Sequence, residues 1–562
     1  MNRLISYLLI YALTVAVQVV AQQQPQRERR TQPTPSPTAS PTPVPSPTPL
    51  ASPVPAGSPE SRLDARPTPS ARVTTTTNTR EELLARINEI LRRSELSPTI
   101  VGIKVASLNS GRVLFEENAN KLLRPASNMK LYTVAAALDR LSPDYRFVTS
   151  VYATARPDAA GILHGDLTIY GRGDPSIAAR FSNGDYFKGI NDLASRIAAA
   201  GVKRVEGDLV GDETYFTGPQ YGGGWSWEDL QWWYGAEVSA LTINDNALDL
   251  SVKPGSTVGA PAIITTGPPD PLLSIVNRVT TGAQGSRRDL SLHRGLNANV
   301  LEVNGSMPID DRGYTAGVGI SHPALLFVYL LRSALSQRGV TITGKSRIVS
   351  ASAHASAATS TNPTGLTEIA SLQSPPLKVI AAQTLKPSQN LYTELILRTL
   401  GKVAPLPPVP PAVSNGIHTS EGAGLEVVKT FLREAGVNTS NLALTDGSGL
   451  SRGDMVTPEA TIQLLIHMSR HRYAAAFREA LPIAGVDGTL RNRMRGTVAE
   501  NNVRAKTGTL SSAASLSGYV TTAGGENLVF SIIVNNYPED TEVRTVCIDP
   551  ITVLLASFAG RS

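Results

Sequence analysis

The sequence predicts an α+β fold, in which one core of helices and a sheet is interrupted by a large β-rich insertion. Near the start, a helical pattern of apolar residues over 83–94 is followed by two β-branched runs at 99–118. Near the end, a second strand–turn–strand pattern at 516–537 precedes an apolar helix at 546–558. Between these ends, residues 151–347 are rich in short β-like runs, turns and glycine. The two ends of the chain are therefore expected to build one domain together.

The composition bounds the size and the partners of the protein. The chain has 562 residues, of which 41% are hydrophobic and 17% are charged, enough for roughly two to four domains with buried cores. The net charge is +6, but no dense block of lysine and arginine is interleaved with aromatic residues. We therefore expect no nucleic-acid partner. The single cysteine, Cys547, excludes an intrachain disulfide bond.

Residues 1–21 are expected to be a signal peptide. A basic start at residues 1–3 precedes an uncharged, mostly apolar run over 4–20, and small residues before Gln22 suit cleavage. The alternative is an uncleaved anchor, because a run of this length lies at the short limit of a membrane span. No cysteine lies nearby, which excludes a lipoprotein anchor. We expect secretion to the periplasm or cell envelope, with a membrane tether through the N-terminus in the uncleaved case.

Residues 22–78 are expected to form a disordered linker. The stretch consists largely of proline, serine, threonine and alanine, as in TPSPTASPTPVPSPTP, and it cannot bury enough apolar surface to offset its ordering entropy. Its proline density favours polyproline II, so it would act as a semi-rigid tether. A second proline-rich stretch at residues 405–416 has no purpose that the sequence indicates.

Folded structure is expected to begin at Thr79, which forms a capping-box pattern with Glu82. We divide the rest of the chain into a discontinuous domain of residues 79–150 and 348–562, and an inserted β-rich region of residues 151–347 with two nested subdomains. The insertion contains four tryptophans that either belong to its core or line a groove for stacking sugars: Trp225, Trp227, Trp232 and Trp233.

The motif Ser127-Asn-Met-Lys130 opens the helical pattern MKLYTVAAALDRL. Residues i and i+3 of a helix share a face, with Cβ atoms about 5–6 Å apart. A lysine at that place accepts the serine proton if burial or a nearby cation lowers its pKa. Taken alone, the pattern is more typical of a helix-starting serine beside a solvated lysine.

Two further motifs change that interpretation. Ser388-Gln-Asn390 stands where a loop gives way to an apolar helix, and Lys506-Thr-Gly-Thr509 stands immediately before a strand pair. Ser-x-x-Lys, Ser-x-Asn and Lys-Thr-Gly in this chain order form the active-site signature of penicillin-recognising serine enzymes. Each motif is weak by itself, but three in order and in context make coincidence improbable.

The stretch between the first two motifs is far longer than in β-lactamases or simpler carboxypeptidases. With this spacing the sequence resembles the class C low-molecular-mass penicillin-binding proteins, the D-alanyl-D-alanine carboxypeptidase/endopeptidase family. The resemblance covers about residues 80–560 and includes YGRGDPSI, GDETYF, YGAEVSALTINDN, TDGSGLSRGD and LPIAGVDGTLRNRM. It implies that residues 79–150 and 348–562 form a penicillin-binding transpeptidase/β-lactamase-like catalytic domain, with an antiparallel sheet flanked by helices.

The resemblance also implies acyl transfer at peptidoglycan stem peptides, either at a D-Ala-D-Ala end or at a D,D-crosslink. Ser127 is the expected nucleophile and Lys130 the expected base. Ser388 would relay a proton to the leaving amine. Lys506 is expected to lower the pKa of Lys130 through like-charge repulsion.

The second and third motifs are expected to bind the substrate. The residues concerned are Asn390, Lys506, Thr507, Gly508 and Thr509. Asn390 suits the substrate amide, whereas the charge of Lys506 and the hydroxyl of Thr507 suit the terminal carboxylate. The family places the oxyanion hole at the backbone N–H groups of Ser127 and Thr509. Because β-lactams mimic the acyl donor, the resemblance implies that they inhibit the enzyme.

Three other positions carry weaker expectations. Asp212 and Arg452 resemble family positions that bind the side chain of the diamino acid in the stem peptide. The acid would pair with the ammonium group of that side chain, and the arginine with its carboxylate. The alternatives are a turn residue for Asp212 and a surface ion pair for Arg452. Asp174 is expected to be structural, because Gly-Asp-Pro favours turns.

Three alternative functions have different requirements. A zinc peptidase needs clustered ligands, but the histidines are scattered; only His467 and His471 are expected to share a helix face, as a solvated pair. We therefore expect no metal and no cofactor. A β-lactamase would need a structural feature that speeds deacylation, and the sequence indicates none. A non-catalytic peptidoglycan-binding protein would tolerate loss of the catalytic side chains, but all of them are present.

Overall fold

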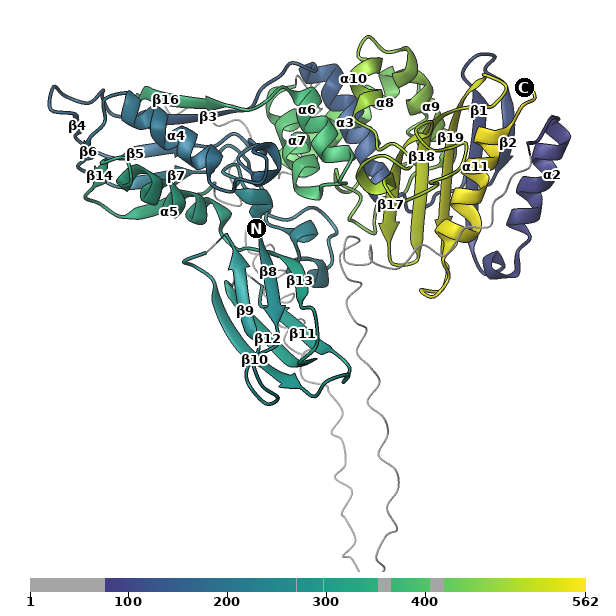
Figure 1. Cartoon of the computed structure of the whole chain (residues 1–562). Coiled ribbons are helices and arrows are strands. Elements are labelled where there is room, and N and C mark those ends of the chain that lie inside the picture. The colour runs from purple at the N-terminus through teal and green to yellow at the C-terminus, as the bar shows by residue number, and fades with distance from the viewer. Residues whose placement is uncertain (1–75, 269, 297, 352–364, 405–418) are drawn as a thin grey trace, which may run out of the picture. The chain divides into compact units, whose positions relative to one another are not determined.

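The computed structural model describes residues 76–562 except 269, 297, 352–364 and 405–418 (Figure 1). The expected signal peptide, almost all of the expected linker and the proline-rich stretch at 405–416 lie outside the described residues. Among the described helices, none is long and apolar enough to cross a membrane.

The main sheet joins the two ends of the chain. Its five strands run antiparallel in the order β17-β18-β19-β1-β2. Their bounds are β1 (Ile100–Ser107), β2 (Val113–Glu117), β17 (Arg504–Leu510), β18 (Ala513–Thr521) and β19 (Asn527–Asn535). Both expected strand–turn–strand patterns are therefore hairpins of one sheet. β18 and β19 are buried along almost their whole length, since helices cover both faces of the sheet.

Helices α2 (Arg80–Leu91) and α11 (Asp549–Ser557) cover one face of this sheet. The hydroxyl of Thr79 caps α2 by accepting a hydrogen bond from the N–H of Glu82 at 3.1 Å, as its position in the sequence predicts. A short π-helical turn, Arg544–Ile548, precedes α11, and Pro550 lies in the first turn of α11. The proline thus begins the last helix.

A layer of helices packs on the other face and forms the largest core. Its members are α3 (Met129–Leu141), α6 (Leu377–Leu385), α7 (Asn390–Val403), α8 (Ser420–Glu434), α9 (Pro458–Arg470) and α10 (Ala474–Glu479). α3 lies inside this layer, because every residue from Met129 to Leu138 is buried. The first two motifs stand at the N-terminal ends of α3 and α7.

The chain between α3 and α6 forms a second, mixed sheet with its own core. The order is β15-β7-β5-β3-β16, with bounds β3 (Val148–Ala153), β5 (Leu167–Tyr170), β7 (Leu209–Asp212), β15 (Ser346–Val349) and β16 (Thr367–Gln373). β16 pairs with β3, so this sheet extends beyond residue 347, where the sequence pattern places the end of the insertion. A small sheet joins β4 (Ile162–Leu163), β6 (Arg204–Val205) and β14 (Thr341–Ile342). Helices α4 (Lys188–Ala199) and α5 (Pro323–Ser336) contribute apolar faces to the same core.

Residues 247–319 form two further three-stranded sheets around a separate core. One sheet is β13-β8-β9 and the other is β10-β12-β11. The bounds are β8 (Ala247–Lys253), β9 (Ile263–Gly267), β10 (Ser274–Gly282), β11 (Asp289–Arg294), β12 (Val300–Pro308) and β13 (Tyr314–Gly319). The chain that enters β8, residues 221–246, contacts α7 and the loop between α8 and α9.

Candidate active site

The side chain of Lys130 is completely buried at the start of α3. Its Nζ donates to Ser127 Oγ at 3.0 Å, to Asn390 Oδ1 at 2.6 Å and to the carbonyl oxygen of Ser448 at 2.6 Å. Burial lowers the pKa of Lys130 to about 7, although neighbouring carboxylates oppose this shift. A substantial fraction of this lysine is therefore neutral near pH 7, and a neutral amine is able to accept the proton of Ser127.

The second serine–lysine contact joins the second motif to the third. Nζ of Lys506, on β17, donates to Ser388 Oγ at 2.9 Å and to the carbonyl oxygen of Thr507 at 2.9 Å. Burial lowers the pKa of Lys506 well below its ordinary value, and like-charge repulsion from Lys130 lowers it further. Burial is the main cause of the lowered pKa at both lysines.

Asn390 connects the contacts around Lys130 to the inserted region. Its Oδ1 accepts from Lys130, and its Nδ2 donates to the carbonyl oxygen of Tyr234 at 2.8 Å. A carbonyl oxygen only accepts hydrogen bonds, so the carbonyl of Tyr234 binds the NH₂ group of the Asn390 carboxamide. The oxygen of that carboxamide is thereby directed toward Lys130. Sequence reasoning missed Tyr234, since a backbone carbonyl leaves no signal in the residue type.

The third motif runs along the edge strand of the main sheet, beside the segment that carries Ser127. Thr507 is held by Thr489, with the two hydroxyl oxygens 2.7 Å apart. A Cβ atom on Gly508 would lie 2.5 Å from the carbonyl oxygen of Pro125, so only glycine permits this close approach. Thr509 follows at an exposed position near the end of β17.

Two of the segments that carry these groups have unusual backbone conformations. Ala126, directly before Ser127, has φ 48°, and Ser388 has φ 66°. Non-glycine residues seldom adopt these conformations, and they persist only where surrounding contacts impose them. The side chain of Ser388 is thereby aimed at Lys506.

The structure thus gathers these residues into two hydrogen-bonded groups: Lys130 with Ser127 and Asn390, and Lys506 with Ser388 and Thr507. The repulsion that Lys130 exerts on Lys506 places the two groups near each other. A family model for the D-Ala-D-Ala carboxypeptidase 3 (S13) family matches residues 83–558. This chain belongs to that family. The match confirms the predicted family and the predicted class of serine-type hydrolase.

Individual relatives agree with the family assignment. The D-alanyl-D-alanine carboxypeptidase of Actinomadura sp. (strain R39) is 35% identical over 490 residues, which cover 85% of each chain. The D-alanyl-D-alanine carboxypeptidase DacB of Haemophilus influenzae is 25% identical over 458 residues, covering 79% of this chain and 87% of that protein. The crystal structure of penicillin binding protein 4 from Haemophilus influenzae has a TM-score of 0.69 at 22% identity, covering 82% of this chain and 98% of that one. This likeness confirms the predicted α+β, penicillin-binding type of fold.

In this S13 family member, Arg452 contacts an acid that sequence reasoning missed. Its Nη1 donates to Ser226 Oγ at 2.8 Å and lies 3.2 Å from Asp229 Oδ2. Burial raises the pKa of Asp229, and Arg452 opposes that rise. Asp229 and Arg452 also influence the pKa of Tyr234, whose carbonyl oxygen binds Asn390, so the ion pair lies close to the second motif.

Asp212 and Asp174 make local contacts of the kind that turns require. Asp212 Oδ1 accepts from the N–H and the hydroxyl of Thr214 at 2.9 and 2.6 Å. Asp174 is buried, and its Oδ1 accepts from the N–H and the hydroxyl of Ser176 at 2.8 and 2.7 Å. Burial raises the pKa of Asp174 to about 6. A substrate-binding role for Asp212 stays a prediction.

The tryptophans of the insertion have different environments. Trp232 belongs to the core around β8 and β12, whereas Trp227 is 62% exposed. Trp233 packs against Gly317 on β13. Trp225 is half-buried, and its indole N–H donates to Asp446.

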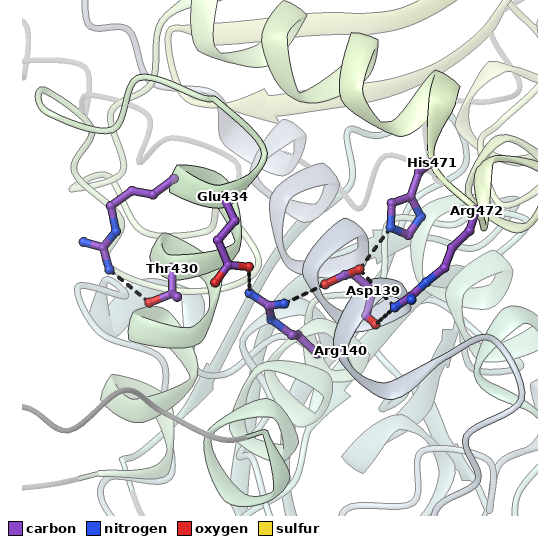
Figure 2. Close-up of polar contacts among 7 residues, drawn as sticks. Asp139, Arg140, Thr430, Glu434, His471 and Arg472 are labelled. Atoms are coloured by element: carbon purple, nitrogen blue, oxygen red, sulfur yellow. Dashed lines mark hydrogen bonds and ion pairs between the residues drawn. The ribbon is translucent and has the colours of Figure 1, made fainter.

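His471 belongs to a separate polar cluster, shown in Figure 2. α9 ends at Arg470, so His471 lies just beyond the helix, and its Nε2 bonds to Asp139 Oδ1 at 3.0 Å. The expectation that His471 is solvated is therefore wrong, whereas its ring does lie beside that of His467, with the ring centroids 5.5 Å apart. Asp139 also contacts Arg140 and Arg472 at 2.9 and 3.3 Å. Among the described residues, no group of histidine, cysteine and acidic side chains is arranged to hold a metal ion.

Proposed function

We propose that this chain is an exported serine D,D-carboxypeptidase and D,D-endopeptidase that cleaves peptidoglycan stem peptides through an acyl-enzyme on Ser127. The observation that carries the proposal is the contact of 3.0 Å between Ser127 Oγ and a buried lysine whose pKa is lowered to about 7. A hydroxyl next to such an amine is an activated nucleophile. The 35% identity to a D-alanyl-D-alanine carboxypeptidase supports the same substrate class.

The acylation step follows from the contacts around Ser127. Neutral Lys130 accepts the hydroxyl proton while Ser127 Oγ bonds to the carbonyl carbon of the penultimate D-alanine. Ser388 passes its hydroxyl proton to the departing amine as the carbon–nitrogen bond breaks, and the ammonium of Lys506, whose Nζ contacts Ser388 Oγ, returns a proton to Ser388. Water then adds to the ester, and the stem peptide leaves with a new carboxylate while Ser127 regains its proton. Backbone N–H groups of Ser127 and Thr509 would stabilise the oxyanion, and each such donor contributes about 3–4 kcal/mol to lowering the barrier.

The terminal carboxylate of the substrate fits beside Lys506 and Thr507. A carboxylate near Lys506 favours the ammonium form and counteracts the effect of burial on its pKa. The diamino acid side chain of the stem peptide fits beside Arg452, and Asp229 is the acid that accompanies this arginine. An arginine and an acid together match both charged ends of a diamino acid that carries an ammonium and a carboxylate.

The location and the domain organisation form part of the proposal. Residues 1–21 would direct export to the periplasm or cell envelope, and residues 22–78 would tether the catalytic domain. The expected division into a catalytic domain (residues 79–150 and 348–562) and an inserted region stays a proposal. β-Lactams would acylate Ser127, because they present a strained amide to the same nucleophile. The resulting acyl group would leave Ser127 slowly.

The test uses purified crosslinked muropeptides and mass spectrometry of the products. Release of D-alanine from pentapeptide monomers, together with conversion of dimers to monomers, supports both activities, and Ser127→Ala serves as the inactive control. Rapid, sustained turnover of a chromogenic cephalosporin without any action on muropeptides would identify a β-lactamase instead. Binding of muropeptides without any product would identify a non-catalytic protein.

A further inference from the structure

The loop of residues 446–451, between α8 and α9, passes directly behind the nucleophile. All of its residues are buried, including Asp446, Ser448 and Ser451. Gly449 has φ +78°, and a Cβ atom there would lie 1.9 Å from the carbonyl oxygen of Ala126, the residue before Ser127. The loop therefore packs against the backbone that carries the nucleophile, with no room for a side chain between them.

The same loop supplies an acceptor to the base. The carbonyl oxygen of Ser448 accepts from Lys130 Nζ at 2.6 Å, which equals the distance from that nitrogen to Asn390 Oδ1. The position of this carbonyl therefore helps to decide where Nζ lies relative to Ser127 Oγ. A shift of the loop would change the distance over which the serine proton is transferred.

The carboxylate of Asp446 organises the loop from inside. It accepts from four groups of the loop itself: the hydroxyl of Ser448 at 2.7 Å and the N–H groups of Gly449, Leu450 and Ser451 at 2.7, 3.2 and 3.3 Å. These bonds set the shape of the loop. They leave its placement in the protein to contacts from outside.

One outside contact to this carboxylate comes from the inserted region. The indole N–H of Trp225 donates to Asp446 Oδ2 at 2.7 Å. The chain around Trp225 lies unusually close to the loop, since a Cβ atom on Gly224 would be 2.4 Å from Ser451 Oγ and one on Gly223 would be 2.9 Å from the carbonyl oxygen of Thr445. Two adjacent glycines thus let this segment approach until the indole reaches the carboxylate.

We propose that Trp225 is a positioning residue for acylation: its N–H holds Asp446, and through the 446–451 loop it fixes the Ser448 carbonyl that places Lys130 beside Ser127. The inserted region thereby takes part in the chemistry without contacting the reacting atoms. This inference rests on the proposed acyl-enzyme mechanism. It extends that mechanism to a residue more than 200 positions away from Asp446 in the chain.

The alternative is that Trp225 only packs between the inserted region and the catalytic helices. Its ring does contact an aromatic cluster that includes Tyr215 and Phe216. The two roles separate cleanly, because phenylalanine keeps an aromatic ring at this place and removes the N–H donor. Trp227, two residues along and exposed, provides the matched control for the same substitution.

The experiment measures acylation of the purified protein by a fluorescent penicillin in a stopped-flow instrument, which separates the dissociation constant of the first complex from the acylation rate constant. For Trp225→Phe we expect the rate constant to fall about tenfold, as loss of a hydrogen bond to a charged group allows. The dissociation constant and the final extent of labelling should stay at the wild-type values. Trp227→Phe should match the wild type in all three quantities.

Three outcomes would overturn the inference. They are an unchanged rate constant in Trp225→Phe, an equal loss in Trp227→Phe, and a change confined to the dissociation constant, which would make Trp225 a substrate contact. A thermal unfolding curve of each variant accompanies the kinetics. The rate constants are compared at a temperature at which both Trp225→Phe and Trp227→Phe are fully folded. If the wild-type protein takes up no penicillin at all, the proposed function itself fails.

Discussion

Nζ of Lys506 lies 2.9 Å from Oγ of Ser388, and this contact parallels the one of 3.0 Å between Lys130 and Ser127. Two pairs, each of a half-buried serine and a buried lysine, therefore stand near each other, and Lys130 repels Lys506. Only the first pair lies within one motif at the start of a helix, α3, whereas the second joins Ser388, just before α7, to Lys506 on β17. We assign attack to Ser127 and proton relay to Ser388 on this basis.

Replacement of Lys130 by alanine should lower the acylation rate about 10²–10⁴-fold, because the general base is lost. Fluorescent penicillin labelling, followed over time, measures this effect. Lys378→Ala is the matched control, since Lys378 is an exposed lysine paired with Asp144. Labelling of Lys130→Ala at nearly the wild-type rate would show that another group acts as the base.

The acylation rate of the wild-type protein should rise with pH through a midpoint near 7. Only the neutral form of Lys130 accepts a proton, and burial lowers the pKa of that group to about 7. The rate constant, measured from pH 5.5 to 9 with an uncharged acyl donor, reports the midpoint. A rate independent of pH over this range would contradict the assignment.

The buried lysine should also make stability depend on pH. Its pKa is about 7 in the folded protein and about 10.5 in the unfolded chain, so the unfolded state binds more protons between these values. The free energy of unfolding should therefore rise as the pH increases from 7 toward 10, and the penalty for burying the charge is fully present below pH 7. Lys130→Met removes this titration.

Urea unfolding of the wild type and of Lys130→Met at pH 7, 8.5 and 9.5 measures the difference. The wild type should gain stability relative to the variant at each step, by a total on the order of a few kcal/mol. Parallel curves for the two proteins would mean that Lys130 keeps an ordinary pKa in the folded state.

Arg452→Ala should lower kcat/KM about tenfold or more on stem peptides that carry an ionised diamino acid side chain. The effect should be much smaller on the same peptides with that side chain blocked, because the lost contact is specific to its charge. Arg472→Ala, which removes an exposed arginine from the cluster around Asp139, is the control. Equal losses on both substrates would exclude a role for Arg452 in side-chain recognition.

The sequence sufficed to predict the α+β fold and the three motifs, because each depends on short-range patterns. The capping box at Thr79 and the two hairpins of the main sheet are local features of this kind. α4 in the insertion was missed, although Ile190, Leu193, Ala194 and Ile197 have the spacing of one buried helix face. The glycine-rich and β-branched surroundings hid that signal.

The remaining features of the site depend on contacts between distant segments. Asp229 reaches Arg452 across more than 200 positions, and the Tyr234 carbonyl reaches Asn390 across 156. Acceptors such as the carbonyls of Tyr234 and Ser448 belong to every residue type, so no pattern of side chains distinguishes them. Such contacts become visible only when the fold brings the segments together.

The most direct test of the central claim is to find the residue that carries the acyl group. The protein is incubated with benzylpenicillin, quenched in acid and digested, and the peptides are analysed by tandem mass spectrometry. The account predicts a penicilloyl adduct on Ser127 and none in Ser127→Ala. An adduct on Ser388 or on another residue, or an intact protein without any adduct, would contradict it.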